Sequence, residues 1–75
     1  MPLAFVMISA EIGKEGEILS QLKKIGHVKE ASPVYGVYDI VARVEAATMD
    51  ELNQVVSANV RRLAGVRSTL TLVVM

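Results

Sequence analysis

The sequence predicts an α+β fold of the split βαβ, or ferredoxin-like, kind: βαββαβ, a four-stranded antiparallel sheet with two helices on one face. Two segments have the apolar spacing of amphipathic helices, and four have the composition of strands. They follow one another as strand, helix, strand, strand, helix, strand. Two right-handed crossovers would place both helices on the same side of the sheet.

The first half of the chain predicts a strand, a helix and a second strand. Residues 3–10 are a continuous apolar run, typical of a strand covered on both faces. A helix is expected over residues 14–25, followed by Gly26 as its C-terminal cap. Its apolar residues share one face: Ile18, Leu19, Leu22 and Ile25. Residues 28–35 contain Pro33, which favours an edge strand, where a missing N–H costs least.

The second half predicts a strand, a helix and a closing strand. Residues 38–45 read as a strand, and residues 66–75 are a strand rich in β-branched residues. Between them, Thr48 and Glu51 have the spacing of a capping box at a helix start. The helix runs to about Leu63 with one apolar stripe, and Gly65 closes it.

Alternation along the strands predicts which side chains face the helices. In the third strand these are Tyr38, Ile40, Ala42 and Val44, which leaves Asp39, Val41, Arg43 and Glu45 on the open face. In the last strand Val66, Ser68, Leu70, Leu72 and Val74 are expected under the helices, with Arg67, Thr69, Thr71, Val73 and Met75 opposite. The first strand has bulky residues on both faces. The open face is therefore partly apolar, and we expect it to pack on a second subunit.

Composition limits the function classes. The 75 residues make one domain, and eight basic residues balance eight acidic ones, so no direct DNA binding is expected. With no Cys and only His27, no metal site, cofactor or catalytic residue is expected. The N-terminus lacks a signal peptide, and its apolar run is too short to span a membrane. These features predict a cytoplasmic protein.

The stretch "PVYGVYDIV", residues 33–41, is the most distinctive part of the chain. Gly36 and Val37 suit a two-residue type II′ turn, whose first central residue needs positive φ. Tyrosines beside a hairpin are commonly packing residues. Asp39 is unusual, because aspartate is disfavoured in strands unless it makes a turn bond or meets a cation.

The whole chain resembles the effector-binding domain, or RAM domain, of the Lrp/AsnC family of feast/famine regulators. The matching motifs are "VYGVYDIVARVEA" at 34–46 and "LAGVRSTLTLVVM" at 63–75, with "TMDELNQVV" similar to the start of the family's second helix. The resemblance covers residues 1–75 as a single domain. The chain starts at the first strand of that domain, so it resembles stand-alone members that lack the helix-turn-helix.

The resemblance implies an amino-acid sensor that modulates the transcriptional regulation of amino-acid metabolism. It implies homodimers joined through their sheets. These dimers would assemble into higher oligomers such as octamer or decamer rings, alone or together with full-length Lrp/AsnC regulators. The effector would be held between dimers. Asp39 would bind the α-ammonium, and backbone N–H groups near Gly36 the carboxylate. The implied ligand-binding residues are Tyr35, Gly36, Val37, Tyr38, Asp39, Thr69 and Thr71.

Two other classes stay open, because a ferredoxin-like fold does not determine function. A small enzyme of the dimeric α+β barrel type would use a cavity between sheet and helices, into which alternation directs Tyr38. No acid/base pair accompanies that tyrosine in the sequence. The other alternative is a module that sets the oligomeric state without any ligand. An ACT-like sensor shares the element order but belongs to the sensing class.

Overall fold

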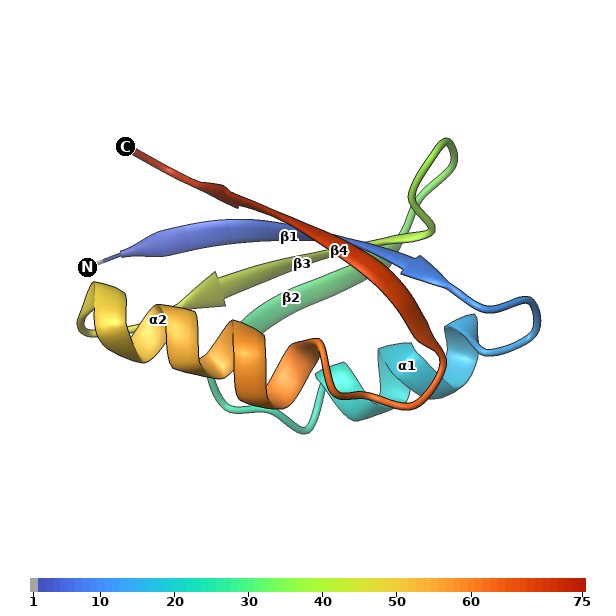
Figure 1. Ribbon diagram of the computed structural model, residues 1–75, viewed down its shortest axis with the longest axis horizontal. Coiled ribbons are helices and arrows are strands. Elements are labelled where there is room, and N and C mark those ends of the chain that lie inside the picture. The colour runs from blue at the N-terminus through green and yellow to red at the C-terminus, as the bar shows by residue number, and fades with distance from the viewer. Residues whose placement is uncertain (1) are drawn as a thin grey trace.

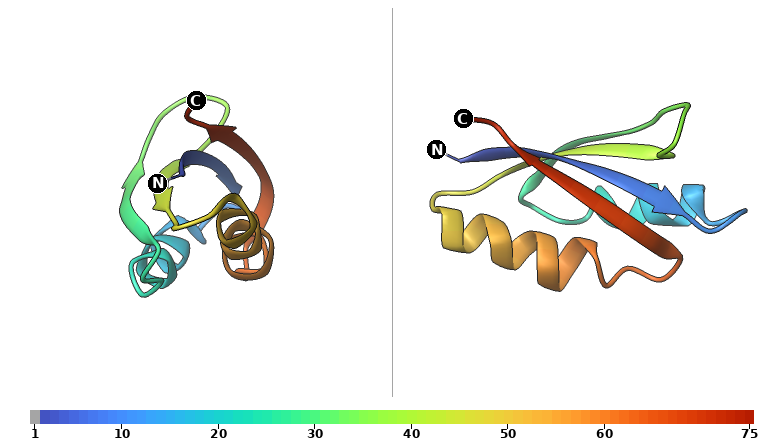
Figure 2. Two further views of the ribbon diagram at one scale, coloured as in Figure 1. Left: turned by 90° about the vertical axis from the view of Figure 1, so that its left-hand side faces the viewer. Right: turned by 45° about the horizontal axis from the view of Figure 1, so that its top comes forward.

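The computed structural model describes residues 2–75. Its elements follow the predicted order (Figure 1). They are β1 (Leu3–Ala10), α1 (Glu15–Leu22), β2 (Val28–Pro33), β3 (Ile40–Glu45), α2 (Met49–Val55), the π-helical turn η1 (Val56–Val60) and β4 (Val66–Val73). The four strands form one antiparallel sheet in the order β2-β3-β1-β4. Both helices lie on one face of it (Figures 1 and 2), so the ferredoxin-like prediction is confirmed.

The core lies between the sheet and the helices. Alternate residues of the two central strands and the apolar stripes of the helices are buried there. They include Ala4, Val6, Ile8, Ile18, Leu22, Ile40, Ala42, Val44, Leu52, Val55, Val56 and Val60. Each fully buried Val, Leu or Ile contributes roughly 1.5–3 kcal/mol relative to an exposed one. The predicted orientation of β3 is therefore confirmed for Ile40, Ala42 and Val44.

Both helices end earlier than predicted. α1 ends at Leu22, because Lys24 and Ile25 donate to carbonyls only three residues back, at Gln21 and Leu22. Gly26 does not have positive φ and is not the expected cap. The second helix is α-helical to Val55 and π-helical from Val56 to Val60. It therefore ends three residues before the predicted end at Leu63.

Gly65 is required at the α2–β4 connection rather than as a helix cap. Its φ is +92°, and a Cβ at this position would lie 2.8 Å from the Cβ of Lys14. Its carbonyl also accepts the N–H of Glu11 at 2.8 Å. The absence of a side chain therefore lets this connection pack against the start of α1.

The hairpin between β2 and β3 is wider than the predicted two-residue turn. The strands end at Pro33 and begin again at Ile40, so the predicted bounds 28–35 and 38–45 were too long. A bond from Val34 N–H to the Asp39 carbonyl, 2.8 Å, encloses the four residues between them. Gly36 has φ +127°, which confirms the predicted need for positive φ. Tyr38 lies in this loop, so strand alternation does not determine where it points.

The orientation predicted for β4 is right at Val66, which packs against the core, and wrong from Ser68 onward. In the register with β1, Thr69 pairs with Ile8 and Thr71 with Val6, which are buried on the helix face. Leu70 and Leu72 are instead on the open face. The physical reason is a β-bulge: Ser68 pairs with Ser9 and Val66 with Ala10, so Arg67 is an extra residue that shifts the alternation by one.

Candidate functional site

The hairpin and the β1–α1 connection meet at one end of the molecule. Because β1 and β3 are antiparallel, the last residues of β1 lie beside the first residues of β3. Figure 1 shows the hairpin rising above this end, with the start of α1 below it. A depression of about 410 Å³ lies there, lined by Glu15, Pro33, Val34, Tyr35 and Asp39. It is the candidate effector site, and two of the predicted residues line it.

Asp39 is held rigidly in this depression by β1. Its N–H donates to the Ile8 carbonyl at 2.9 Å, and its Oδ2 accepts the N–H of Ala10 at 2.8 Å. The Ala10 N–H at the end of β1 needs a hydrogen-bond acceptor, which explains why an aspartate occupies position 39. Within residues 2–75, no donor bonds the other oxygen, Oδ1. That oxygen can accept a hydrogen bond from a ligand.

Glu15 is a lining residue that the sequence analysis missed. It is the first residue of α1, and its Oε1 accepts the N–H of Gly13 at 2.9 Å. The order of the elements indicates this position. The first residue of α1 follows closely after the end of β1, and the end of β1 lies beside the start of β3, where the hairpin ends. With Asp39 it makes the site acidic, which suits a ligand with an ammonium group.

The other predicted site residues are not gathered in the depression. Gly36 and Val37 lie exposed at the hairpin tip, and Tyr38 is half-buried in the loop. Thr69 and Thr71 are on β4, separated from β3 by β1, and they face the helix side. The expectation that they share the open face with Asp39 is therefore wrong. Any contribution of these threonines to the same site would have to come from another subunit.

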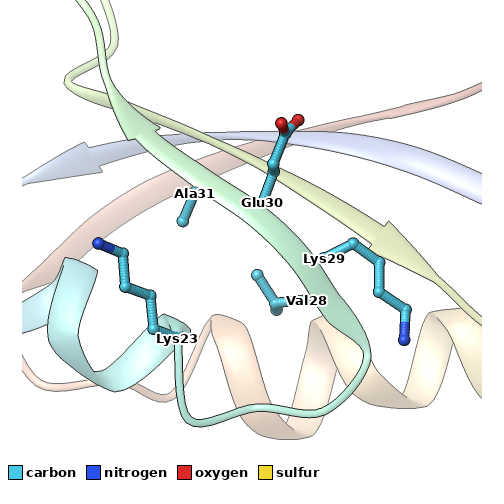
Figure 3. A pocket seen from close by; sticks show the side chains of 5 residues that line it. All are labelled: Lys23, Val28, Lys29, Glu30 and Ala31. Carbon is cyan, nitrogen blue, oxygen red and sulfur yellow. The ribbon is translucent and has the colours of Figure 1, made fainter.

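A second depression, of about 330 Å³, lies between α1 and the outer edge of β2 (Figure 3). Val28 and Ala31 line it, and the ammonium groups of Lys23 and Lys29 point to opposite ends of it. Lys29 Nζ is already bonded to the Gly26 carbonyl at 3.1 Å. Glu30 points away, to the other side of the strand (Figure 3). The polar groups around this second depression do not converge on one point, so the depression is a weaker candidate than the hairpin site.

His27 joins the start of β2 to the start of α2. Its Nε2 lies 3.2 Å from Glu51 Oε1, and the same oxygen accepts the N–H of Ala47 at 3.0 Å. Thr48 Oγ1 accepts the N–H of Glu51 at 3.1 Å, as in the predicted capping box, although the glutamate reaches Ala47 rather than the cap residue itself. The Ala47 N–H, with smaller help from His27, holds the pKa of Glu51 below its usual value of 4.5.

Comparison with known proteins places the fold and the hairpin motif in a family. Residues 3–75 match the family described as the Lrp/AsnC ligand binding domain. The chain belongs to this family. In the Lrp/AsnC proteins this segment is the ligand-binding part, so the chain is an effector-binding module of the regulatory type. Within residues 2–75, no helix is long and apolar enough to cross a membrane.

Several known proteins show the extent of the likeness. The crystal structure of FFRP-DM1 is 33% identical with a TM-score of 0.96, and each chain covers the other completely. Escherichia coli AsnC is 27% identical with a TM-score of 0.90, and 99% of this chain covers 50% of AsnC. The homocitrate synthase of Sulfurisphaera tokodaii is 43% identical over 58 residues. That match spans 77% of this chain but only 12% of the enzyme.

Proposed function

We propose that this domain, residues 1–75, binds a free amino acid at the hairpin and transmits its presence through changes in self-association. The observation that carries the proposal is Asp39. Within residues 2–75, its carboxylate is held by the Ala10 N–H on one oxygen and is open on the other, and it lines a depression of about 410 Å³. Glu15 adds a second acidic group to the lining. The family match, to a ligand-binding domain, supports the same role.

The ligand's two charged ends need different partners. Asp39 Oδ1 suits the α-ammonium, because a charge-assisted hydrogen bond to a carboxylate is about twice as strong as a neutral one. The ligand's carboxylate would extend from the depression toward the hairpin tip and meet backbone N–H groups near Gly36, where no Cβ blocks the approach. The depression by itself is open to solvent on one side, so a second subunit would complete it.

The hairpin tip is suited to that completion. Tyr35 and Val37 are fully exposed there, which a hairpin that only connects two strands does not need. We propose that dimers pack through their open sheet faces and meet other dimers through these tips. Octamer or decamer rings, and mixed rings with full-length Lrp/AsnC regulators, are the assemblies through which the signal would reach transcription.

The proposal is tested by calorimetric titration of the purified chain with each of the twenty amino acids, with light scattering before and after addition. We expect one or a few to bind and to change the assembly size. In Asp39→Asn, binding should weaken roughly ten- to a hundredfold, because the ammonium loses a charged partner. Gln54→Glu, on the exposed side of α2, is the control. If none of the twenty binds the parent chain, the ligand-free oligomerisation module becomes the better description.

A second candidate rests on the homocitrate synthase match. A segment 43% identical to this chain is part of that enzyme, so the same sensing domain could act on catalysis rather than on transcription. A chimeric enzyme tests this: the matching segment of the Sulfurisphaera synthase is replaced by this chain. Enzyme control predicts that the chimera responds to an amino acid that binds the isolated chain, and that Asp39→Asn in the chimera removes the response. A chimera of normal activity without any response would count against it.

A further inference from the structure

The hairpin depression carries charge of one sign. Within residues 2–75, its lining includes two carboxylates, those of Glu15 and Asp39, and no cationic side chain. Both residues are half-buried. Among residues 2–75 neither carboxylate forms an ion pair, and Lys14, the neighbour of Glu15 in the chain, lies 3.4 Å from Glu17 instead. The negative charge of the depression is therefore not balanced from within this part of the chain.

Each of the two carboxylates is held by the backbone through one oxygen. Asp39 Oδ2 accepts the N–H of Ala10 at 2.8 Å, and Glu15 Oε1 accepts the N–H of Gly13 at 2.9 Å. The donors belong to the end of β1 and to the β1–α1 connection, so the two side chains are positioned independently. Within residues 2–75, the second oxygen of each carboxylate accepts no hydrogen bond. The depression thus offers two separate acceptors to a ligand.

An amino acid with an uncharged side chain cannot balance both carboxylates. Its ammonium group can meet one of them, and the ligand's own carboxylate cancels that positive charge. An acidic side chain would add repulsion. A side chain that ends in a cation supplies a second positive group, and its hydrogen bond to a carboxylate is charge-assisted, about twice as strong as a neutral one.

The remaining lining residues suit the aliphatic part of a long cationic side chain. Pro33 and Val34 contribute apolar groups, and Tyr35 contributes an aromatic ring. Long cationic side chains lay their methylene groups along apolar surface and keep the charged end in a polar environment. An aromatic ring also attracts an ammonium or guanidinium group placed over its face.

We propose that the ligand is a basic amino acid, such as lysine, ornithine or arginine. Asp39 binds its α-ammonium, and Glu15 binds the cation at the end of its side chain. This inference rests on the proposed function and adds to it the class of ligand. It makes Glu15 the residue that determines the specificity of the site.

Paired calorimetric titrations with lysine and norleucine test the class of ligand. Norleucine is lysine without its ε-ammonium group, so the ratio of the two affinities isolates that group. Lysine should bind the parent chain roughly tenfold more tightly than norleucine, because it gains a charge-assisted hydrogen bond. Glutamate should bind more weakly than norleucine.

Glu15→Gln tests the residue, since glutamine can still accept the Gly13 N–H. Its affinity for lysine should fall close to that for norleucine, while its affinity for norleucine should stay within about twofold of the parent value. A merely structural role of Glu15 would weaken both ligands equally. Glu11→Gln, exposed in the β1–α1 connection, removes the same charge outside the depression and should keep the parent ratio.

The outcomes separate this inference from the proposed function. If no amino acid binds the parent chain, both are overturned. If neutral amino acids bind and lysine binds no more tightly than norleucine, the site stands and the class of ligand is wrong. A preference for lysine that survives in Glu15→Gln would refute the role of Glu15. Glu15→Asp keeps the charge and should retain a preference for lysine, and its loss there would also count against selection by charge.

Discussion

Asp39 has a structural role that can be separated from its proposed ligand role. Its Oδ2 accepts the Ala10 N–H, a bond that an amide oxygen can also accept. Asp39→Asn should therefore keep the stability of the parent within about 0.5 kcal/mol. Asp39→Ala leaves that N–H without its acceptor and should lower the free energy of unfolding by about 1–3 kcal/mol. Urea titration of both variants measures the difference, and equal stability of Ala and Asn variants would mean that the bond does not matter.

Glu51 should make the stability of the domain sensitive to acid. Its pKa is lowered in the folded chain by the Ala47 N–H and by His27, so the ionised form is the one that folding favours. The ionised Glu51 carboxylate contributes fully to the stability of the fold at pH values above its usual pKa of 4.5. This contribution is lost as the pH falls through the lower pKa of the folded state. Glu51→Gln should be less stable than the parent at pH 7, and the gap should shrink by pH 3. Denaturant titrations at both values test this, with Glu11→Gln, exposed in the β1–α1 connection, as the control.

At the scale of elements, two glycines near the start of α1 should respond in opposite ways. Gly65→Ala should destabilise the chain by more than about 1 kcal/mol, because alanine is strained at positive φ and its Cβ would collide with Lys14. Gly16 lies within α1 and does not have positive φ, and within residues 2–75 a Cβ at this position would meet no atom of another segment within 4 Å. Gly16→Ala should stabilise by about 0.5 kcal/mol through helix propensity. Melting temperatures of the two variants, measured side by side, should move in opposite directions.

The whole molecule should depend on a second copy for its stability. This chain of 75 residues covers one face of its sheet with helices and leaves Phe5, Leu70 and Leu72 exposed on the other. We expect the melting temperature to rise with protein concentration, as linkage requires when only the folded state associates. Leu72→Lys, on the open face, should give a monomer whose melting temperature does not change with concentration. Gln54→Lys, on the exposed side of α2, should behave as the parent does.

The sequence predicts the helices and strands and, for most of them, which side chains point into the core. These features depend on residues close together in the chain. The apolar stripes of both helices and the alternation of Ile40, Ala42 and Val44 are repeats of three to four or of two residues, and they appear where predicted. The positive φ of Gly36 follows from the same local chemistry. The hairpin motif also led to two residues of the candidate site, Tyr35 and Asp39.

Only the tertiary structure decided the features that depend on pairing between distant segments. The orientation of β4 reversed because a bulge at Arg67 forms against β1, far away in the chain, and alternation counted along β4 alone cannot detect it. The bond from the Ala10 N–H to Asp39 Oδ2 joins residues 29 positions apart. Glu15 lines the site because the β1–α1 connection lies beside the hairpin, which is also a contact between distant segments. Strand periodicity specifies which side chains alternate, whereas the partner strand specifies where the alternation shifts and which backbone groups still need an acceptor.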